Sequence, residues 1–114
     1  MTIHDWLDYL ETLSSGFTIA SLDHVKHVAA QLKLRKFTCP VIVVAGTNGK
    51  GSCVAFLEKI YSAAGYKTAT YTSPHVIKYN ERIRLNGQNV DDNDLCTALN
   101  AVKNAKNNTN LSYF

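Results

Sequence analysis

The segment Val41–Ser52, V-I-V-V-A-G-T-N-G-K-G-S, combines glycines, hydroxyl side chains and a lysine at a spacing that could bind phosphate. The usual phosphate-binding loop has a glycine, four further residues and then Gly-Lys-Ser/Thr. Gly49-Lys50 fits that pattern, but Val44 stands where the first glycine belongs and Gly51 stands where the hydroxyl belongs. Two interpretations follow: a phosphate loop of another kind, or a glycine-rich turn with a solvated lysine.

The elements around this segment favour the phosphate loop. Residues 41–45 are short, apolar and mostly β-branched, which predicts a buried strand. A helix is expected from about Lys50 to Ala64, ended by Gly65, and a second strand from Lys67 to Thr72. Strand, loop, helix and strand form a βαβ unit, so the two strands should be parallel. The free amides at the start of the helix would then point into the loop and favour an anion.

We therefore predict a nucleotide site in this loop, which would bind a nucleoside triphosphate with Mg²⁺ as its counterion. Lys50 is the predicted catalytic residue because its charge can reach the β- and γ-phosphates. A further oxygen ligand would be needed to hold the metal. The predicted nucleotide-binding residues are Gly46, Thr47, Asn48, Gly49, Lys50, Gly51 and Ser52.

The remaining pattern predicts one small α/β domain over residues 1–114, a mostly parallel sheet flanked by helices. Helices are expected over residues 3–13, from a cap at Ser21 to Leu34, and from a cap at Asp91 to Asn104. Phe17–Ala20 and Ser73–Asn80 read as loops. Asn86-Gly87 predicts a tight hairpin between residues 82–85 and 88–90. Residues 111–114 resemble the start of another strand.

Composition narrows the class of protein. The net charge of +3 and pI of about 8.8 are too weakly basic to indicate nucleic acid. The three cysteines, Cys39, Cys53 and Cys96, contain no C-x-x-C pair, which favours reduced thiols in a cytoplasmic protein. No signal peptide is recognisable, and the longest apolar run, 41–45, cannot span a membrane.

Three motifs in order resemble one enzyme family: A-G-T-N-G-K-G-S, then Y71-T-S-P-H75, then N80-E-R-I-R84. Together with D5-W-L-D-Y-L10 they are similar to folylpolyglutamate synthase and dihydrofolate synthase of the Mur ligase superfamily. G-T-x-G-K is that superfamily's compressed phosphate loop. The resemblance covers the whole chain and implies the N-terminal portion of the ATP-binding domain, with the C-terminal domain absent.

The resemblance implies a ligase that joins a pteroate or folate carboxylate to L-glutamate through an acyl phosphate made from ATP. It also implies that Ser73 is a magnesium ligand and that Pro74, His75 and Arg82 line the folate site. The alternatives without a function are that Ser73 is an ordinary turn residue, that His75 is a surface histidine, and that Arg82 is solvated or paired with Glu81. Likewise, His24 and His27 share a helix face but lack an evident third metal ligand, and Cys53 is expected to be a packing residue.

The sequence departs from the family in two places. S21-L-D-H-V25 replaces a G-L-E-R-like segment, which puts the pterin preference in question. L111-S-Y-F114 resembles a family strand whose next residue, a glutamate, binds magnesium. We therefore expect a fragment that is inactive by itself and that can self-associate, and a full-length enzyme that is a monomer. A cell-wall Mur ligase and a non-catalytic nucleotide-binding module stay open as alternatives. The preference for dihydropteroate or folylpolyglutamate also stays open.

Overall fold

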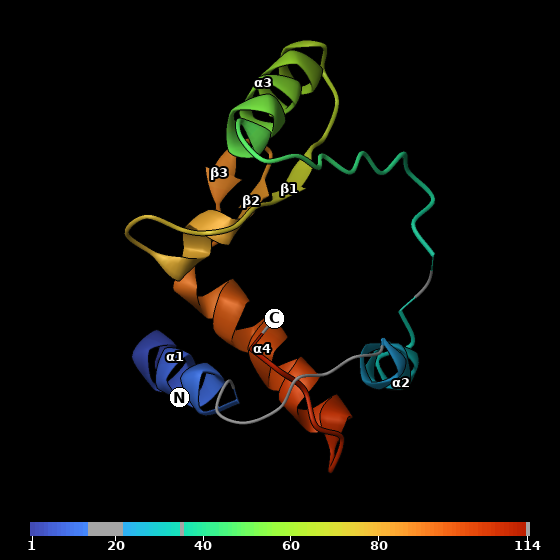
Figure 1. Ribbon diagram of the computed structural model, residues 1–114, viewed down its shortest axis with the longest axis vertical. Helices are drawn as coiled ribbons and strands as arrows, with labels where there is room; N and C mark the ends of the chain where they lie inside the picture. The colour runs from blue at the N-terminus through green and yellow to red at the C-terminus, as the bar shows by residue number, and fades with distance from the viewer. Residues whose placement is uncertain (14–21, 35, 114) are drawn as a thin grey trace. The chain divides into compact units, whose positions relative to one another are not determined.

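The chain forms two structural units in a computed structural model that describes residues 1–13, 22–34 and 36–113. The helical unit comprises Met1–Lys36 and Asn93–Phe114, and the sheet unit comprises Phe37–Asp92. The elements follow along the chain in the order α1, α2, α3, β1, η1, β2, β3 and α4, and Figure 1 labels all of them except the short η1. Helices and a sheet are both present, which confirms the predicted α/β class.

The described residues of the helical unit form three amphipathic helices, as their hydrophobic spacing predicts. α1 spans Ile3–Leu13, α2 spans Asp23–Gln31 and α4 spans Asp92–Lys106. α2 ends before the predicted Leu34, and the predicted loop Phe17–Ala20 and cap Ser21 lie outside the described residues. Among the described residues of this unit, the buried apolar side chains are Trp6, Leu10, Val28 and Leu95.

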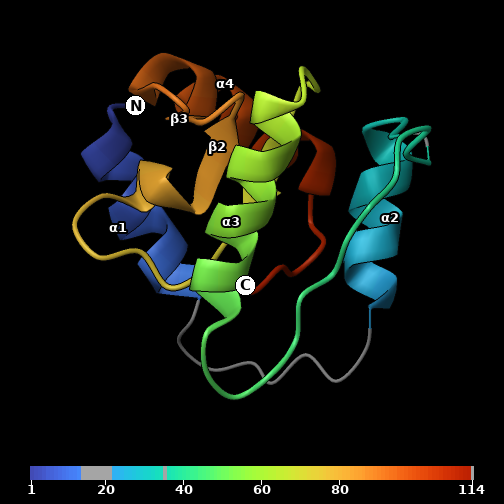
Figure 2. The same ribbon diagram turned by 90° about the horizontal axis from the view of Figure 1, so that it is seen from above.

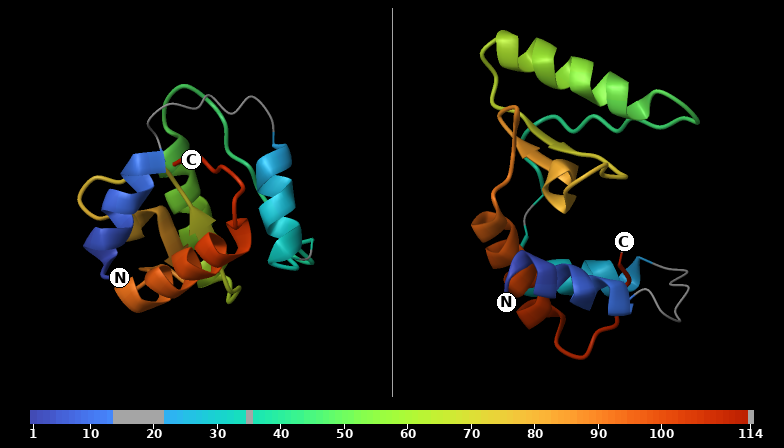
Figure 3. Two further views of the ribbon diagram at one scale, coloured as in Figure 1. Left: turned by 90° about the horizontal axis from the view of Figure 1, so that it is seen from below. Right: turned by 90° about the vertical axis from the view of Figure 1, so that its left-hand side faces the viewer.

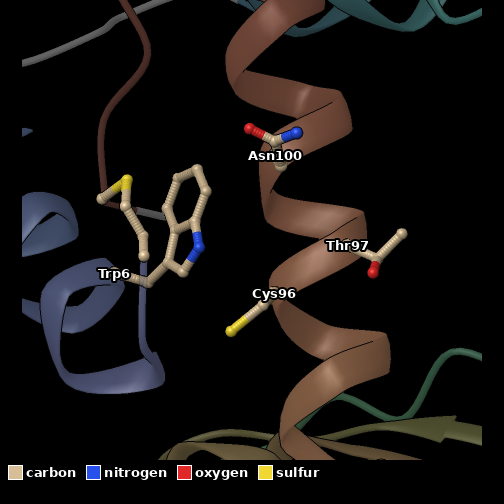
Figure 4. Close-up of a pocket in the computed structure, with 5 residues that line it drawn as sticks. Trp6, Cys96, Thr97 and Asn100 are labelled. Atoms are coloured by element: carbon tan, nitrogen blue, oxygen red, sulfur yellow. The ribbon is translucent and has the colours of Figure 1, made fainter.

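Aromatic and cationic contacts join α1 to α4 within the helical unit. The ammonium of Lys103 lies 5.4 Å from the ring centroid of Trp6 and 4.8 Å from that of Tyr9. Cation–π attraction of this kind contributes about 0.5–1 kcal/mol at an exposed site. Figure 4 shows Trp6 facing Cys96 and Asn100 of α4 across an open pocket of about 280 Å³, which Met1 and Thr97 also line.

The sheet unit is built on three short antiparallel strands. β1 spans Ala69–Tyr71, β2 spans Ile83–Leu85 and β3 spans Gln88–Asn89, with β2 in the middle. Asn86 and Gly87 between β2 and β3 have φ values of 50° and 81°, so the predicted tight hairpin is confirmed. The short 3-10 helix η1, Tyr79–Arg82, leads into β2.

One glutamate connects α3 to two strands of the sheet. α3 spans Lys50–Ala63 and lies along one side of the sheet in the views of Figures 2 and 3. Arg84 of β2 donates its Nε–H to both carboxylate oxygens of Glu58, at 3.2 and 3.1 Å. The hydroxyl of Thr70 in β1 donates to the same carboxylate at 3.3 Å. Since the Glu58 side chain is only 11% exposed, this network fixes the helix to the strands.

The predicted parallel pairing is absent from the residues that the structure describes. Residues 41–45 are not assigned as a strand, and β1 pairs with β2 in antiparallel register, Ala69 opposite Leu85. A buried strand needs neighbours on both edges and faces. Val41, Ile42 and Val43 instead expose 60%, 55% and 84% of their surface. Their apolar sequence therefore predicted burial that the described residues do not provide.

Two further differences concern the ends of elements. No strand is assigned to residues 111–113, and Phe114 lies outside the described residues. β1 is shorter than the predicted 67–72 segment because only its central residues pair with β2. In the parts of the chain that the structure describes, none of the helices combines the length and the apolar character needed to cross a membrane.

Replacing Arg84 by alanine should lower the free energy of unfolding by about 1–3 kcal/mol, because the part-buried Glu58 carboxylate loses its charged partner. Arg84 also donates to Asn89 Oδ1 and to the carbonyl of Gly87, so the hairpin loses support as well. Urea unfolding measures the change. Lys59→Ala, on the exposed side of the same helix, is the control and should have an effect within about 0.5 kcal/mol. Equal effects would contradict the structural role of Arg84.

Candidate functional site

The glycine loop enters α3 through a residue in the left-handed region. Gly49 is the N-cap of α3 with φ 78°, and the first helical hydrogen bond runs from the amide of Cys53 to its carbonyl, at 3.0 Å. The amides of the first helical turn have no partner inside a helix and carry the positive end of its dipole. The predicted nucleotide-binding residues, Gly46 to Ser52, are all exposed. The loop can therefore receive an anion from solvent.

Lys50 folds back over this loop. Its ammonium donates to the carbonyl of Gly46 at 2.5 Å and to that of Thr47 at 3.3 Å. These contacts place one positive charge directly beside the loop backbone. An arriving phosphate would exchange with the two carbonyls as partner of the ammonium.

A second group of candidate residues lies on the segment after β1. The carboxylate of Glu81 accepts hydrogen bonds from the amides of Val76 at 2.9 Å, Ile77 at 2.9 Å and Lys78 at 2.7 Å. These bonds hold the pKa of Glu81 below its ordinary value of 4.5. One side chain thus fixes the backbone between His75 and η1, while the side chains of Val76 and Ile77 stay exposed.

His75 and Arg82 meet beside Tyr79. Arg82 is 6% exposed and donates its Nε–H to His75 Nδ1 at 2.9 Å. The guanidinium carbon lies 5.2 Å from the centroid of the Tyr79 ring, and the His75 and Tyr79 rings are 5.6 Å apart. The structure therefore brings together two of the three predicted folate residues. The third, Pro74, is exposed and follows Ser73 through a cis peptide bond.

The described residues around the glycine loop and Ser73 can supply only some of the ligands that a metal ion needs. Ser73, the predicted metal ligand, is exposed beyond the end of β1. Within the described ranges, no group of three or more His, Cys, Asp or Glu side chains is placed to hold an ion. Mg²⁺ commonly retains several waters and binds through one or two protein oxygens together with phosphate oxygens. A single serine hydroxyl fits that mode of binding, whereas an all-protein cage does not.

Sequence reasoning missed Glu81 and the Glu58–Arg84 pair. Glu81 was considered only as a possible partner of Arg82, and the guanidinium instead contacts His75. The three-residue spacing from Lys78 to Glu81 is that of a capping box, but the box usually begins with serine or threonine. Glu58 and Arg84 lie 26 residues apart, and periodicity within one element cannot pair them.

Comparison with known proteins identifies relatives over nearly the whole chain, although no protein-family model matches it. The chain is 41% identical over 109 residues to the dihydrofolate synthase/folylpolyglutamate synthase of Escherichia coli K12, which covers 96% of this chain and 26% of the relative. The chain is therefore homologous to that protein, and it spans about a quarter of the length of the curated relatives it matches first.

Solved structures give the same result. The structure of E. coli FolC in complex with DHPP and ADP superposes with a TM-score of 0.92 and 39% identity, over 100% of this chain and 28% of that one. A bifunctional folylpolyglutamate synthase/dihydrofolate synthase with Mn, AMPPNP and L-glutamate bound gives a TM-score of 0.91 and 37% identity, over 100% of this chain and 27% of that one.

Two glycines of the loop should respond oppositely to alanine. Gly49→Ala should destabilise the protein by about 1–2 kcal/mol, because φ at this residue is 78° and L-residues are strained there. Gly51→Ala is the matched control, since this glycine lies inside α3 and an added Cβ meets nothing within 4 Å. It should stabilise the helix by about 0.5–1 kcal/mol. Thermal unfolding checks both values, and equal shifts would contradict the left-handed start of α3.

The lowered pKa of Glu81 predicts a pH dependence of the loop it binds. Its contribution to stability is fully present above the ordinary value of 4.5 and is lost as the pH falls through the lower folded-state pKa. Amide exchange at Val76, Ile77 and Lys78 should therefore rise, relative to the intrinsic rate, as the solution is acidified below pH 4.5. Glu81→Gln should already raise this exchange at neutral pH. Protection that is unchanged in the variant would contradict the three hydrogen bonds.

Proposed function

We propose that this chain, as a homologue of dihydrofolate synthase/folylpolyglutamate synthase, is the nucleotide-binding part of an ATP-dependent ligase. The ligase would join a pteroate or folate carboxylate to the amine of L-glutamate. The observation that carries the proposal is the glycine loop at the start of α3, with the ammonium of Lys50 beside its backbone. The homologous structures with ADP, AMPPNP, Mn and L-glutamate in their descriptions support it.

In this proposal, different groups of the loop bind different parts of a triphosphate. Backbone amides of Gly46 to Ser52 would donate to phosphate oxygens, and Lys50 would neutralise charge on the β- and γ-phosphates. Thr47 and Ser52 would add hydroxyl donors. ATP would transfer its γ-phosphoryl group to the substrate carboxylate and leave as ADP, and the amine of L-glutamate would then displace phosphate from the acyl phosphate to form the amide. The protein's share is positioning and charge neutralisation, which phosphoryl transfer chiefly requires.

The segment after β1 would serve the second substrate and the metal. Ser73 would contribute one oxygen ligand to Mg²⁺, whose charge offsets that of the phosphates. Pro74, His75 and Arg82 would line the folate site. The buried arginine and its histidine partner support this role, because a fixed cationic and polar pair suits a carboxylate or carbonyl oxygen. Glu81 would hold the intervening backbone in place.

We also propose that residues 1–114 are the N-terminal portion of an ATP-binding domain whose sheet is larger and mostly parallel. The exposed Val41, Ile42 and Val43 support it, because an apolar β-branched segment is typical of a strand buried on both faces. Phe56 and Ile60 of α3 are also exposed, at 71% and 62%. Residues that follow in relatives of full length would cover these surfaces. Without them, the same surfaces favour self-association of the 114-residue chain.

Lys50→Ala should weaken binding of ATP–Mg by about tenfold, the lower end of the loss expected when one charged hydrogen bond is removed. The lower end applies because the lysine exchanges its bonds to Gly46 and Thr47 for bonds to phosphate. Isothermal titration measures the affinity. Lys59→Ala removes the same charge from the same helix outside the loop and should leave the affinity unchanged.

The same two variants test catalysis in a chain of the relatives' full length. With ATP, dihydropteroate and L-glutamate, the Lys50 variant should lose most of its ADP-forming turnover, and the Lys59 variant should retain it. Equal ATP affinities in the two variants would contradict the nucleotide site. Normal nucleotide binding without glutamate-dependent turnover would contradict the ligase assignment and favour a non-catalytic binding module.

A further inference from the structure

The contact between Arg82 and His75 has a fixed polarity. An arginine side chain stays protonated at every physiological pH and carries only donors. Its Nε–H lies 2.9 Å from His75 Nδ1, so Nδ1 must be the acceptor. A ring nitrogen that accepts carries no proton, and the proton of the neutral imidazole is then on Nε2. The identity of the partner thus determines the tautomer.

The surrounding residues hold the side chains of Arg82 and His75 in this arrangement. Arg82 is 6% exposed, and its guanidinium lies over the ring of Tyr79, which also contacts His75. Glu81 fixes the three amides that follow His75 along the chain. The backbone after His75 and the tilted contact of its ring with Tyr79 therefore both restrain the histidine beside Arg82.

We infer that Arg82 is a positioning residue that holds His75 as the neutral tautomer with its proton on Nε2, so that His75 serves substrate as a hydrogen-bond donor and not as a base. The lone pair that a base would use, on Nδ1, is engaged by Arg82. The group that Nε2–H can recognise is an acceptor, such as a carboxylate or carbonyl oxygen of the pteroate. This last point rests on the proposed function, whereas the tautomer does not.

A second histidine of the chain provides an internal reference. His24 Nδ1 lies 2.7 Å from the carbonyl oxygen of Asn110, which can only accept. His24 therefore carries a proton on Nδ1, opposite to His75. Two histidines in one molecule should thus report the two tautomers, and the comparison needs no external standard.

Long-range ¹H–¹⁵N spectra of the histidine-labelled chain test the tautomer, recorded at about pH 8 where histidines are mostly neutral. His75 should show a protonated Nε2 and an unprotonated Nδ1, and His24 the reverse. Arg82→Ala should move the His75 pattern toward a mixture, and Arg82→Lys should keep the charge but lose the fixed Nε–H geometry. A proton on Nδ1 of His75, or an unchanged pattern in the alanine variant of folded protein, would overturn the inference.

Steady-state kinetics in a chain of full length test the donor role. His75→Gln can place an amide N–H near the position of Nε2, whereas the shorter His75→Asn reaches only the position of Nδ1. The asparagine variant should raise KM for dihydropteroate at least severalfold more than the glutamine variant, with little change in KM for ATP. Equal KM values in the two variants would overturn the donor role. Because the Lys50 variants test nucleotide binding separately, this failure is distinguishable from failure of the proposed function.

Discussion

The arrangement of the sheet unit depends on the hydrogen bonds that the carboxylate of Glu58 accepts. The carboxylate accepts hydrogen bonds from Arg84 in β2 and Thr70 in β1, and so fixes α3 relative to both strands. α3 carries the glycine loop at its first residue, and β1 leads into the segment with Ser73 and His75. One part-buried ion pair therefore fixes the elements that carry the two candidate sites relative to each other. Neither residue of the pair belongs to a site.

A similar division holds in the segment after β1. Glu81 engages the three backbone amides that follow His75, and Arg82 engages a ring nitrogen of His75, the residue that is proposed to meet a ligand. In both cases a charged side chain forms hydrogen bonds with groups that are close to it in the chain. The N-E-R-I-R motif thus combines residues that support the proposed site with residues that support the fold.

Local pattern was enough to predict the helices, the hairpin and the position of the glycine loop. The spacing of Trp6 and Leu10 identified α1, and Asn86-Gly87 identified the turn between β2 and β3. Sheet topology was not predictable in the same way, because the antiparallel pairing of β1 with β2 joins residues that are 12 or more positions apart in the sequence. The partners of Glu58 and His75 were missed because they depend on that pairing and on loop geometry. The identity of the glycine loop residues was clear, while their action on a nucleotide stays a prediction.

The self-contacts of Lys50 have a consequence for the heat of nucleotide binding. Its ammonium already holds the carbonyls of Gly46 and Thr47, so the bonds gained with a phosphate replace bonds that are lost. The enthalpy that this lysine adds is therefore a difference between two hydrogen-bonded states. The enthalpy of binding at such a loop should come mainly from the backbone amides at the start of α3, which have no hydrogen-bond partner inside the helix. Removing the lysine would then change the binding affinity more than it changes the binding enthalpy.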